Sequence, residues 1–290
     1  MSSFISRVAR LAALGMIALS LGTVSPLSAS ETSPAGRRTV EIIGHRGASH
    51  DAPENTLAAV KLSWKQNADG TEIDVHLSKD GKIVVIHDDN TKRTAGLDKP
   101  VVAQSIEELR KLDAGSWKDP KFAGEKLPTL DEVIATIPDG KRLFIEVKCG
   151  PEIVPELKRV IEAGGKKPEQ TAIISFSQEV VAESKKAMPA LRVFWITRFQ
   201  QDKKTKVWSP SSIEELIEKT KSAKVDGIDL GFTPNLDRAM IDQVKQAKLE
   251  FYVWTVDSAD DARLLRDWGV DGITTNRPLF IRQSLNSPAQ

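Results

Sequence analysis

The sequence contains almost no cysteine, has no excess of charge of either sign, and lacks a long apolar run beyond Ser30. Cys149 is the only cysteine among 290 residues, so no internal disulfide can form and the fold depends on burial of apolar side chains. Lysine and arginine number 41, against 40 for aspartate and glutamate. This balance gives no reason to expect nucleic acid or an anionic membrane as a partner.

Several motifs of common enzyme classes are also absent. There is no Gly-x-Ser-x-Gly sequence, which argues against a hydrolase with a serine nucleophile on a sharp turn. The phosphate-binding Walker sequence and the glycine-rich dinucleotide fingerprint are missing as well. The chemistry therefore has to be sought in histidine, arginine and carboxylate residues.

The segment 1–30 has the pattern of a secretory signal peptide. Arg7 and Arg10 precede an apolar run over 11–21, and small residues follow up to Ser30. We expect cleavage near Ala29 or Ser30 and a periplasmic or secreted mature protein, with an uncleaved anchor as the alternative. The apolar run is shorter than the roughly 20 residues of a membrane-spanning helix. Stable membrane insertion of the mature chain is not expected.

After a linker over 31–39, strand-like runs alternate with amphipathic helical runs, which is typical of βα units around a parallel sheet. Ser-Lys-Asp-Gly at 78–81 predicts a hairpin turn, and leaving out the second arm of that hairpin gives eight strands. We therefore predict a (β/α)8 TIM barrel over 40–283, an insertion over about 88–127 and a tail over 284–290. The predicted strands are 40–44, 72–77, 82–86, 143–147, 172–176, 192–197, 227–230, 251–256 and 272–275.

Helix starts are indicated by capping residues. Asn55 is expected to cap the first helix, and a short helix is expected over 105–112 within the insertion. Three further starts place a hydroxyl three residues before an acid: Thr129 with Glu132, Ser212 with Glu215, and Ser258 with Asp261.

The most informative stretch is 42–56, where two apolar residues lead into Gly-His-Arg-Gly. His45 can exchange protons near neutral pH, and Arg46 can hold phosphate or carboxylate with its fixed fork of donors. The flanking glycines allow a tight turn and a close approach of the backbone to a ligand. A strand end with an incidental histidine and a surface arginine is the simpler alternative.

Acidic residues on two strands point to a metal site. Alternate side chains of a strand share a face, so Glu72 and Asp74 point the same way, as do Glu146 and Lys148. Carboxylates placed together inside a barrel repel each other unless a cation lies between them. Oxygen ligands suit Mg²⁺ or Ca²⁺ better than zinc. Alternatively, these acids pair with Arg46 and Lys148 for structural reasons.

His87 ends the second hairpin arm, so two histidines follow different strand-like runs. The C-terminal ends of barrel strands meet at one mouth, where active sites lie. Two histidines with a metal and an arginine are suited to phosphodiester displacement. One can remove a proton from the nucleophile and the other can protonate the leaving alkoxide, while the cations offset the charge on phosphorus.

The motifs together resemble the glycerophosphodiester phosphodiesterase family, in the family's order and over 42–278. They are His45-Arg46-Gly47, Pro53-Glu54-Asn55-Thr56, Glu72-x-Asp74-Val75, Lys79-Asp80-Gly81, His87-Asp88, Leu127-Pro128-Thr129-Leu130, Glu146-Val147-Lys148, Trp254-Thr255-Val256 and Gly269–Pro278. The resemblance implies a barrel with an insertion after the hairpin. It also implies hydrolysis of small glycerophosphodiesters to glycerol 3-phosphate and an alcohol.

The resemblance further implies residue roles. Glu72, Asp74 and Glu146 would bind one divalent cation, Ca²⁺ or Mg²⁺, and His45 and His87 would form the acid–base pair. Arg46 and Lys148 would bind the substrate phosphate. Our hypothesis for the histidines is that His45 is the base and His87 the acid.

Four other residues allow weaker predictions. Trp254 either contacts the glycerol part of the substrate or packs in the barrel, and Trp195 is expected to pack. We expect His76 at the rim of the mouth and His50 in solvent.

Two other functions remain open on these residues. One is phospholipase D-like hydrolysis of lysolipids, which would need an apolar ramp beside the mouth. The other is an inactive barrel that serves as a periplasmic binding module. The basic loop over 198–208 is most simply a solvated loop, although it could steer anionic substrates or touch a lipid headgroup.

Overall fold

The computed structural model describes residues 39–206, 208–210 and 212–287. The expected signal peptide over 1–30, the linker up to residue 38 and the chain end over 288–290 lie outside this part of the chain. Among the described residues, no helix is both long and apolar enough to cross a membrane.

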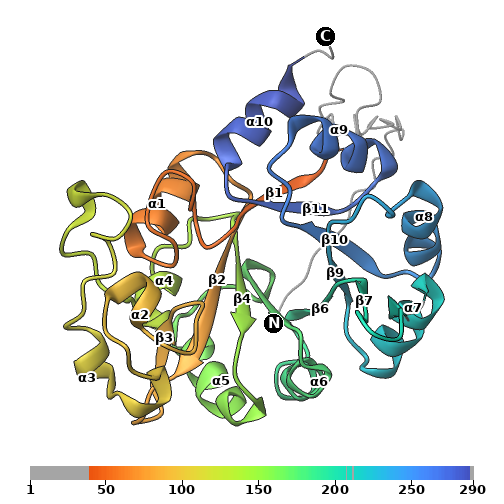
Figure 1. Ribbon diagram of the computed structural model, residues 1–290. Helices are drawn as coiled ribbons and strands as arrows, with labels where there is room; N and C mark the ends of the chain where they lie inside the picture. Colours follow the sequence, from red (N-terminus) through yellow and green to blue (C-terminus); the bar gives the residue numbers. More distant parts are fainter. Residues whose placement is uncertain (1–38, 207, 211, 288–290) are drawn as a thin grey trace, which may run out of the picture. The chain divides into compact units, whose positions relative to one another are not determined.

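Eight parallel strands close into a barrel, with helices between successive strands (Figure 1). β1 pairs with both β2 and β11, which joins the two edges of the sheet. The predicted (β/α)8 architecture is therefore confirmed, and the hairpin arm β3 (Ile83–Val85) pairs with β2 outside the barrel. The barrel strands are β1 (Glu41–Gly44), β2 (Gly70–Leu77), β4 (Arg142–Val147), β5 (Thr171–Ser175), β6 (Arg192–Thr197), β9 (Gly227–Gly231), β10 (Glu250–Trp254) and β11 (Gly272–Thr275).

The helices begin largely where the capping residues predict. The main helices are α1 (Leu57–Lys65), α4 (Leu130–Ile134), α5 (Val154–Ala163), α6 (Gln178–Ala187), α7 (Ile213–Ser222), α8 (Arg238–Gln246), α9 (Ala259–Trp268) and α10 (Pro278–Asn286). Thr129, Ser212 and Ser258 are the N-caps of α4, α7 and α9, as expected.

The prediction for Asn55 was wrong, because Thr56 is the N-cap of α1 and accepts a hydrogen bond from the backbone N–H of Ala59. The Asn55 amide instead binds Asp74.

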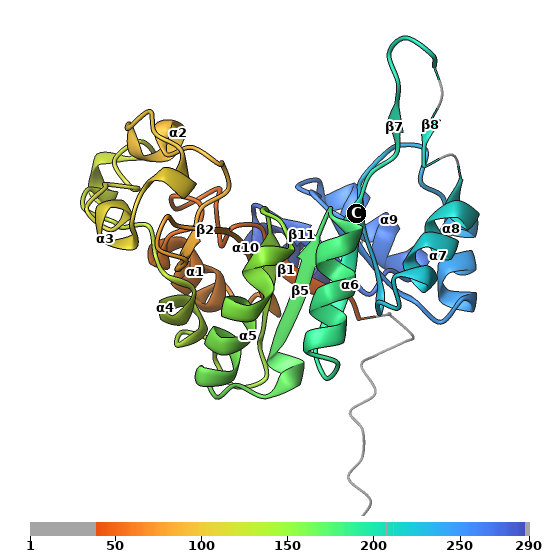
Figure 2. The same ribbon diagram turned by 90° about the horizontal axis from the view of Figure 1, so that it is seen from below.

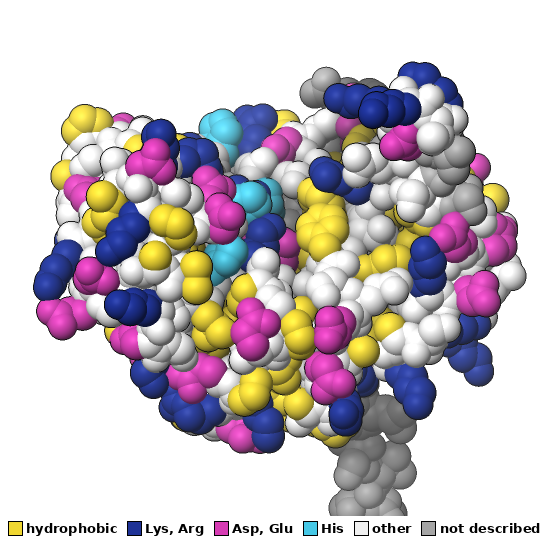
Figure 3. Space-filling view, turned by 60° about the horizontal axis from the view of Figure 1, so that its bottom comes forward, with side chains coloured by type: hydrophobic (Ala, Val, Ile, Leu, Met, Phe, Trp, Pro, Cys, Tyr) yellow, Lys and Arg dark blue, Asp and Glu magenta, His cyan; other side chains and the backbone are white. Residues whose placement is uncertain are grey.

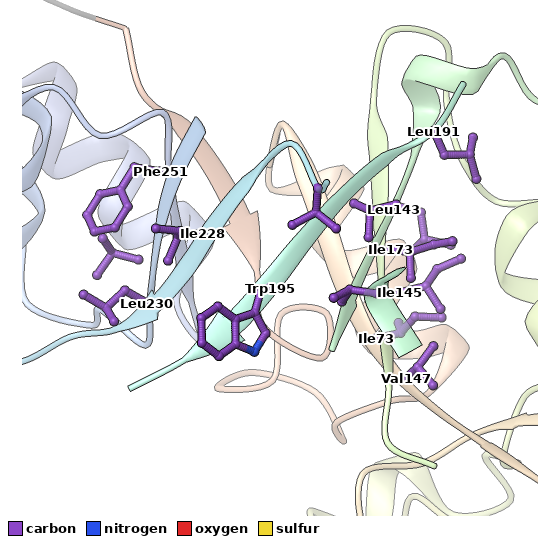
Figure 4. Packing of buried hydrophobic residues seen from close by; sticks show 14 of the residues in the cluster. Ile73, Leu143, Ile145, Val147, Ile173, Leu191, Trp195, Ile228, Leu230 and Phe251 are labelled. Atoms are coloured by element: carbon purple, nitrogen blue, oxygen red, sulfur yellow. The ribbon is translucent and has the colours of Figure 1, made fainter. Parts of the chain in front are cut away.

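The core follows the alternation of the strands. Side chains such as Ile73, Ile145 and Leu230 point outward and pack beneath the helices (Figure 4). Their neighbours point into the barrel, where the rings of Phe144, Phe194 and Tyr252 lie 4.9–6.2 Å apart. This apolar layer closes the barrel interior below the polar residues of the mouth. Trp195 is buried in the outer layer, as expected (Figure 4).

The segment between β3 and α4 forms a compact lobe (Figures 1 and 2). It contains α2 (Lys92–Ala95) and α3 (Ile106–Leu109), so the second of these helices is shorter than the expected 105–112. Its apolar side chains Ile86, Val101, Leu109, Ala114 and Leu127 form a separate cluster with Val84 of β3. The insertion therefore has a small apolar core of its own.

Two features differ from the sequence prediction. The basic loop after β6 contains a short antiparallel pair, β7 (Gln200–Gln201) with β8 (Trp208–Ser209), which extends away from the helices (Figure 2). The last helix, α10, continues to Asn286, past the expected barrel end at residue 283. The reason is that Ile281 and Leu285, one helical turn apart, are both buried in the core.

Candidate active site

Three carboxylates meet inside the barrel at the mouth. Glu72 and Asp74 project inward from β2, and Glu146 projects inward from the neighbouring β4. One oxygen from each lies within 4.8 Å of the others, and all three side chains are buried. The parallel register pairs Asp74 with Glu146, which explains why two separate strands deliver carboxylates to one point.

The cations beside these carboxylates compensate only part of their charge. Lys148 Nζ lies 2.6 Å from Glu146 Oε1 and 3.3 Å from Asp74 Oδ1, and Arg46 Nε lies 3.3 Å from Asp74 Oδ2. Burial would raise the pKa of Asp74, but Lys148 and Arg46 outweigh it and lower this pKa. Burial and Asp74 raise the pKa of Glu146 to about 7. Burial and the neighbouring acids raise the pKa of Glu72 well above its usual value.

These residues fit a divalent cation. Three carboxylates face two cationic side chains, and the raised pKa values of Glu72 and Glu146 mean that a further positive charge is needed to keep all three ionised. Oε1 of Glu72 is buried and has no hydrogen-bond partner among the described residues, as expected of an atom suited to coordinate a metal. The donor set consists of carboxylate oxygens only, which suits Ca²⁺ or Mg²⁺.

The turn after β1 places Arg46 against this cluster. Arg46 has a left-handed backbone conformation, with φ of 55°, and its N–H donates to Glu72 Oε2 at 2.8 Å. Gly47 follows with φ of 84°, and a Cβ atom there would lie 2.5 Å from the carbonyl carbon of Ala59. Only glycine meets both conditions, so the turn that positions Arg46 depends on Gly47.

His45 is held in one orientation by hydrogen bonds. Its Nδ1 lies 2.8 Å from Oδ1 of Asn276, which also accepts a bond from the Ser49 hydroxyl. The Asn276 amide is oriented by Asp257, whose carboxylate accepts from Nδ2 at 2.6 Å and from the Asn276 backbone N–H at 2.8 Å. Burial and the Arg46 charge lower the pKa of His45, which favours its neutral form.

His87 follows β3 and faces the same pocket. Its Nδ1 lies 2.7 Å from Oδ1 of Asp88, whose carboxylate is also bound by Arg93 at 2.7 and 3.0 Å. Arg93 in turn binds Glu54, and Glu54 binds Arg46 at 2.8 Å. A chain of alternating charges therefore runs from Arg46 to His87 through the first helix of the insertion.

One pocket of about 390 Å³ at the barrel mouth is lined by His45, Arg46, Glu72, His87, Glu146 and Lys148, and Asp74 adjoins it through the carboxylate cluster. On this face of the molecule, histidine, basic and acidic side chains gather around a hollow (Figure 3). The rest of the lining includes the apolar side chains of Ile174, Phe176, Ile196 and Trp254. Trp254 packs edge-on against Phe176 and donates to the Asp229 carbonyl, so it has a packing role and also borders the pocket.

The structure thus brings together every predicted site residue: His45, His87, Arg46, Lys148, Glu72, Asp74, Glu146 and Trp254. The two remaining histidines lie outside it. His50 is exposed, as expected, and pairs with Asp51. The rim position expected for His76 was wrong, because this side chain is buried and its Nε2–H donates to the His87 carbonyl.

Sequence reasoning missed several functional candidates. Asn276 and Asp257, which orient His45, lie near the other end of the chain; Asn276 falls within the Gly269–Pro278 motif, which assigned it no role. Asn55 was assigned to a helix cap, but it binds both the carboxylate and the backbone N–H of Asp74.

Asp229 on β9 lines the pocket, and burial, together with Glu146, raises its pKa to about 8. The sequence signal that could have identified Asp229 is an acid in the middle of an otherwise apolar strand.

Comparison with known proteins identifies the family. The sequence profile of the glycerophosphoryl diester phosphodiesterase family matches residues 45–279. A glycerophosphodiester phosphodiesterase from Caldanaerobacter subterraneus subsp. tengcongensis is 34% identical over 243 residues, which cover 82% of this chain and 94% of the relative. Another, from Bacillus subtilis, is 30% identical over 290 residues, which cover 91% of this chain and 94% of the relative.

Solved structures agree with this relationship. A phosphodiesterase from Oleispira antarctica, in complex with the product sn-glycerol-3-phosphate, aligns with a TM-score of 0.76 at 27% identity and covers 85% of this chain and 97% of that one. A glycerophosphodiester phosphodiesterase from Agrobacterium tumefaciens aligns with a TM-score of 0.70 at 27% identity. The alignment covers 84% of this chain and 100% of that one. With a profile match over most of its length and relatives that align over nearly their whole length, this chain belongs to the glycerophosphoryl diester phosphodiesterase family.

Proposed function

We propose that this enzyme hydrolyses glycerophosphodiesters to glycerol 3-phosphate and an alcohol, with one divalent cation, Ca²⁺ or Mg²⁺, and an acid–base pair of His45 and His87. The observation that carries the proposal is the convergence of three buried carboxylates, two cations and two histidines on one pocket. The sn-glycerol-3-phosphate bound to the Oleispira relative supports this choice of product.

Glu72, Asp74 and Glu146 would hold the cation, which supplies positive charge to offset the charge that develops on the phosphoryl oxygens. Arg46 and Lys148 flank these carboxylates and would bind the remaining phosphate oxygens. The phosphate would then lie between the cations and the two histidines.

The hydrogen bonds of His45 support its role as base. Asn276 Nδ2 donates to the Asp257 carboxylate, so Asn276 Oδ1 faces His45 and can only accept. His45 Nδ1 must therefore carry the proton, which leaves the Nε2 lone pair available in the neutral ring. A neutral imidazole with a free Nε2 can take the proton of the nucleophile.

The environment of His87 supports the complementary role. The Asp88 carboxylate can only accept, so Nδ1 of His87 also carries a proton. The nearby carboxylate would stabilise an imidazolium during the reaction, as the aspartate of a serine protease triad does. His87 would then give a proton from Nε2 to the departing alcohol.

We also propose that the enzyme acts outside the cytoplasm. The proposal rests on the signal-like segment over 1–30, with its basic start, apolar run and small residues. Cell fractionation of the tagged full-length chain, with N-terminal sequencing of the exported form, tests it. A protein that is retained in the cytoplasm with its first residues intact would contradict it.

Product analysis tests the proposed reaction. Glycerophosphocholine should yield glycerol 3-phosphate and choline in equal amounts, whereas cleavage of the other ester bond would yield glycerol and phosphocholine. Lysophosphatidylcholine should react much more slowly if the substrates are small and water-soluble. Faster release of choline from the lysolipid would instead favour the phospholipase D-like function.

A further inference from the structure

Asp229 is an acid whose inward-facing neighbours in the sheet are apolar. It is the third of five residues of β9, and its neighbours Ile228 and Leu230 point outward into the main core. Its register partners are Ile196 on β6 and Tyr252 on β10, which belong to the inner apolar cluster. The Asp229 side chain therefore lies just above the closed floor of the barrel, on the wall of the active-site pocket.

One oxygen of this carboxyl group has nothing to bind. Asp229 is only 5% exposed, and its Oδ1 has no hydrogen-bond partner among the described residues. A buried polar atom without a partner costs about 1–3 kcal/mol, so such atoms are rare and call for an explanation. The Trp254 indole N–H binds the main-chain carbonyl of Asp229 and leaves the carboxyl group unsatisfied.

Structural roles do not account for this acid. It sits in the middle of a strand, so it caps no helix or turn, and no described lysine or arginine forms an ion pair with it. It is not a member of the carboxylate cluster that could hold a metal ion, which in the described part of the chain consists of Glu72, Asp74 and Glu146. A ligand in the pocket remains as the missing donor.

The composition of the pocket indicates which part of a substrate supplies the missing hydrogen-bond donor to Asp229. The cations and histidines that would bind the phosphate follow β1, β4 and the hairpin arm β3, whereas Asp229 on β9 lines the pocket together with Ile174, Ile196 and Trp254. Burial in this apolar wall disfavours a full negative charge, so a neutral hydroxyl donor suits Asp229 better than a cationic headgroup. Glycerol carries two free hydroxyl groups beside its phosphate ester.

We propose that Asp229 is a specificity-determining residue that accepts a hydrogen bond from a hydroxyl group of the glycerol part of the substrate. The proposal rests on the proposed glycerophosphodiesterase function. In this binding mode the glycerol lies against the wall formed by β6, β9 and β10. The alcohol on the other side of the phosphate points toward the open side of the pocket. Esters without these hydroxyls would leave Asp229 buried and unpaired.

Competitive binding of two phosphate monoesters to the metal-loaded enzyme tests the assignment. The two probes are sn-glycerol 3-phosphate and n-propyl phosphate, which differ only in the two hydroxyl groups. Wild-type enzyme should prefer the glycerol ester by roughly 10- to 100-fold in inhibition constant, as a hydrogen bond to a buried carboxyl group allows. Asp229→Leu should lose most of this preference, and Asp229→Asn, which keeps an acceptor, should retain part of it.

Ile196→Val provides the matched control, because Ile196 neighbours Asp229 on the same wall and has no polar atom. It should keep the wild-type preference between the two esters. If Asp229→Leu keeps the preference too, or if it weakens metal binding, the assignment is wrong. A loss of kcat/KM on glycerophosphocholine but not on glycerophosphoglycerol would also overturn it, by assigning Asp229 to the cationic headgroup.

Failure of the proposed function gives a different result. In that case wild-type enzyme would release no glycerol 3-phosphate from glycerophosphocholine. If wild-type enzyme releases glycerol 3-phosphate but its preference survives in Asp229→Leu, only the role of Asp229 is refuted.

Discussion

At the scale of single residues, His45 and His87 differ in the group that binds Nδ1. An amide oxygen holds His45, and a carboxylate holds His87. An amide oxygen orients the ring without adding charge, whereas a carboxylate supports a positive ring during proton transfer. The two histidines therefore have the partners expected of a base and an acid, respectively.

Leaving-group dependence tests this division of labour. Glycerophosphocholine has a poor leaving group that needs a proton, whereas glyceryl p-nitrophenyl phosphate has a good one that does not. His87→Ala should lose about 100-fold or more in kcat on the first ester and much less on the second. His45→Ala should stay slow on both esters, since the nucleophile still needs a base.

The exposed His50 offers a control, and His50→Ala should match wild-type enzyme on both esters. Rescue of His45→Ala instead of His87→Ala would reverse the assigned roles. Equal losses for both variants on both esters would mean that neither histidine has a distinct protonic task.

Candidate site residues could be predicted from the sequence where they form short patterns. Glu72 and Asp74 alternate on one strand, and His45 adjoins Arg46, so local spacing already suggests a shared purpose. Asp229 has no such pattern, and the Gly269–Pro278 motif gave Asn276 no role. Their importance depends on the atoms they face across the barrel, and only the closed sheet supplies that information.

At the scale of structural elements, the insertion is tied to the catalytic pocket through α2. Arg93 lies on this helix and forms two-pronged contacts to Glu54 and to Asp88, which bind Arg46 and His87 respectively. Its side chain is 43% exposed, so solvent screens these charges. Its contribution is best understood as orientation of both pocket residues.

Replacement of Arg93 tests whether α2 orients the pocket residues. Arg93→Met keeps the aliphatic stem and removes the charged fork, which should cost of the order of 1 kcal/mol. That cost corresponds to a loss of roughly 5- to 10-fold in kcat/KM. Lys92→Met on the same helix removes only an exposed pair with Asp98 and should leave kcat/KM unchanged. Equal kinetics for the two variants would show that α2 does not orient the pocket.

The order of barrel elements was predictable, because each strand and helix has its own periodicity and cap. The exceptions have tertiary causes. The pairing of β7 with β8 lies in a polar loop without strand periodicity. The buried His76 donates to the main-chain carbonyl of His87 on the hairpin arm, a contact that strand alternation does not reveal. Helix α10 extends past the expected barrel end because Leu285 is buried in the core.

At the scale of the whole molecule, the buried carboxylates should make the metal-free protein sensitive to pH. The pKa of Glu146 is raised to about 7, and that of Glu72 is raised as well. An acid whose pKa is higher in the folded state than in the unfolded state stabilises the fold only while it is protonated. This stabilisation is complete below about pH 4.5 and is lost as the pH rises through 7.

We therefore expect the Tm of the metal-free protein to fall by roughly 5–10 °C between pH 5 and pH 8, which calorimetry can measure. Saturating Ca²⁺ or Mg²⁺ should remove most of this fall, because the ion binds the ionised carboxylates of the folded state. Glu146→Gln, which cannot ionise at this position, should show a shallower fall without metal. A Tm that rises with pH over this range would contradict the charge balance described for the site.

The most direct test of the central claim, that Glu72, Asp74 and Glu146 hold the cation needed for hydrolysis, is a metal titration of activity. Chelator-stripped wild-type enzyme should be inactive on glycerophosphocholine and should recover along one saturable curve as Ca²⁺ or Mg²⁺ is added. Glu146→Gln keeps the shape of the side chain and removes one charge, so it should need at least about tenfold more metal for half-maximal activity and should recover only partly. Full activity of the stripped enzyme, or an identical metal requirement in Glu146→Gln, would contradict the claim.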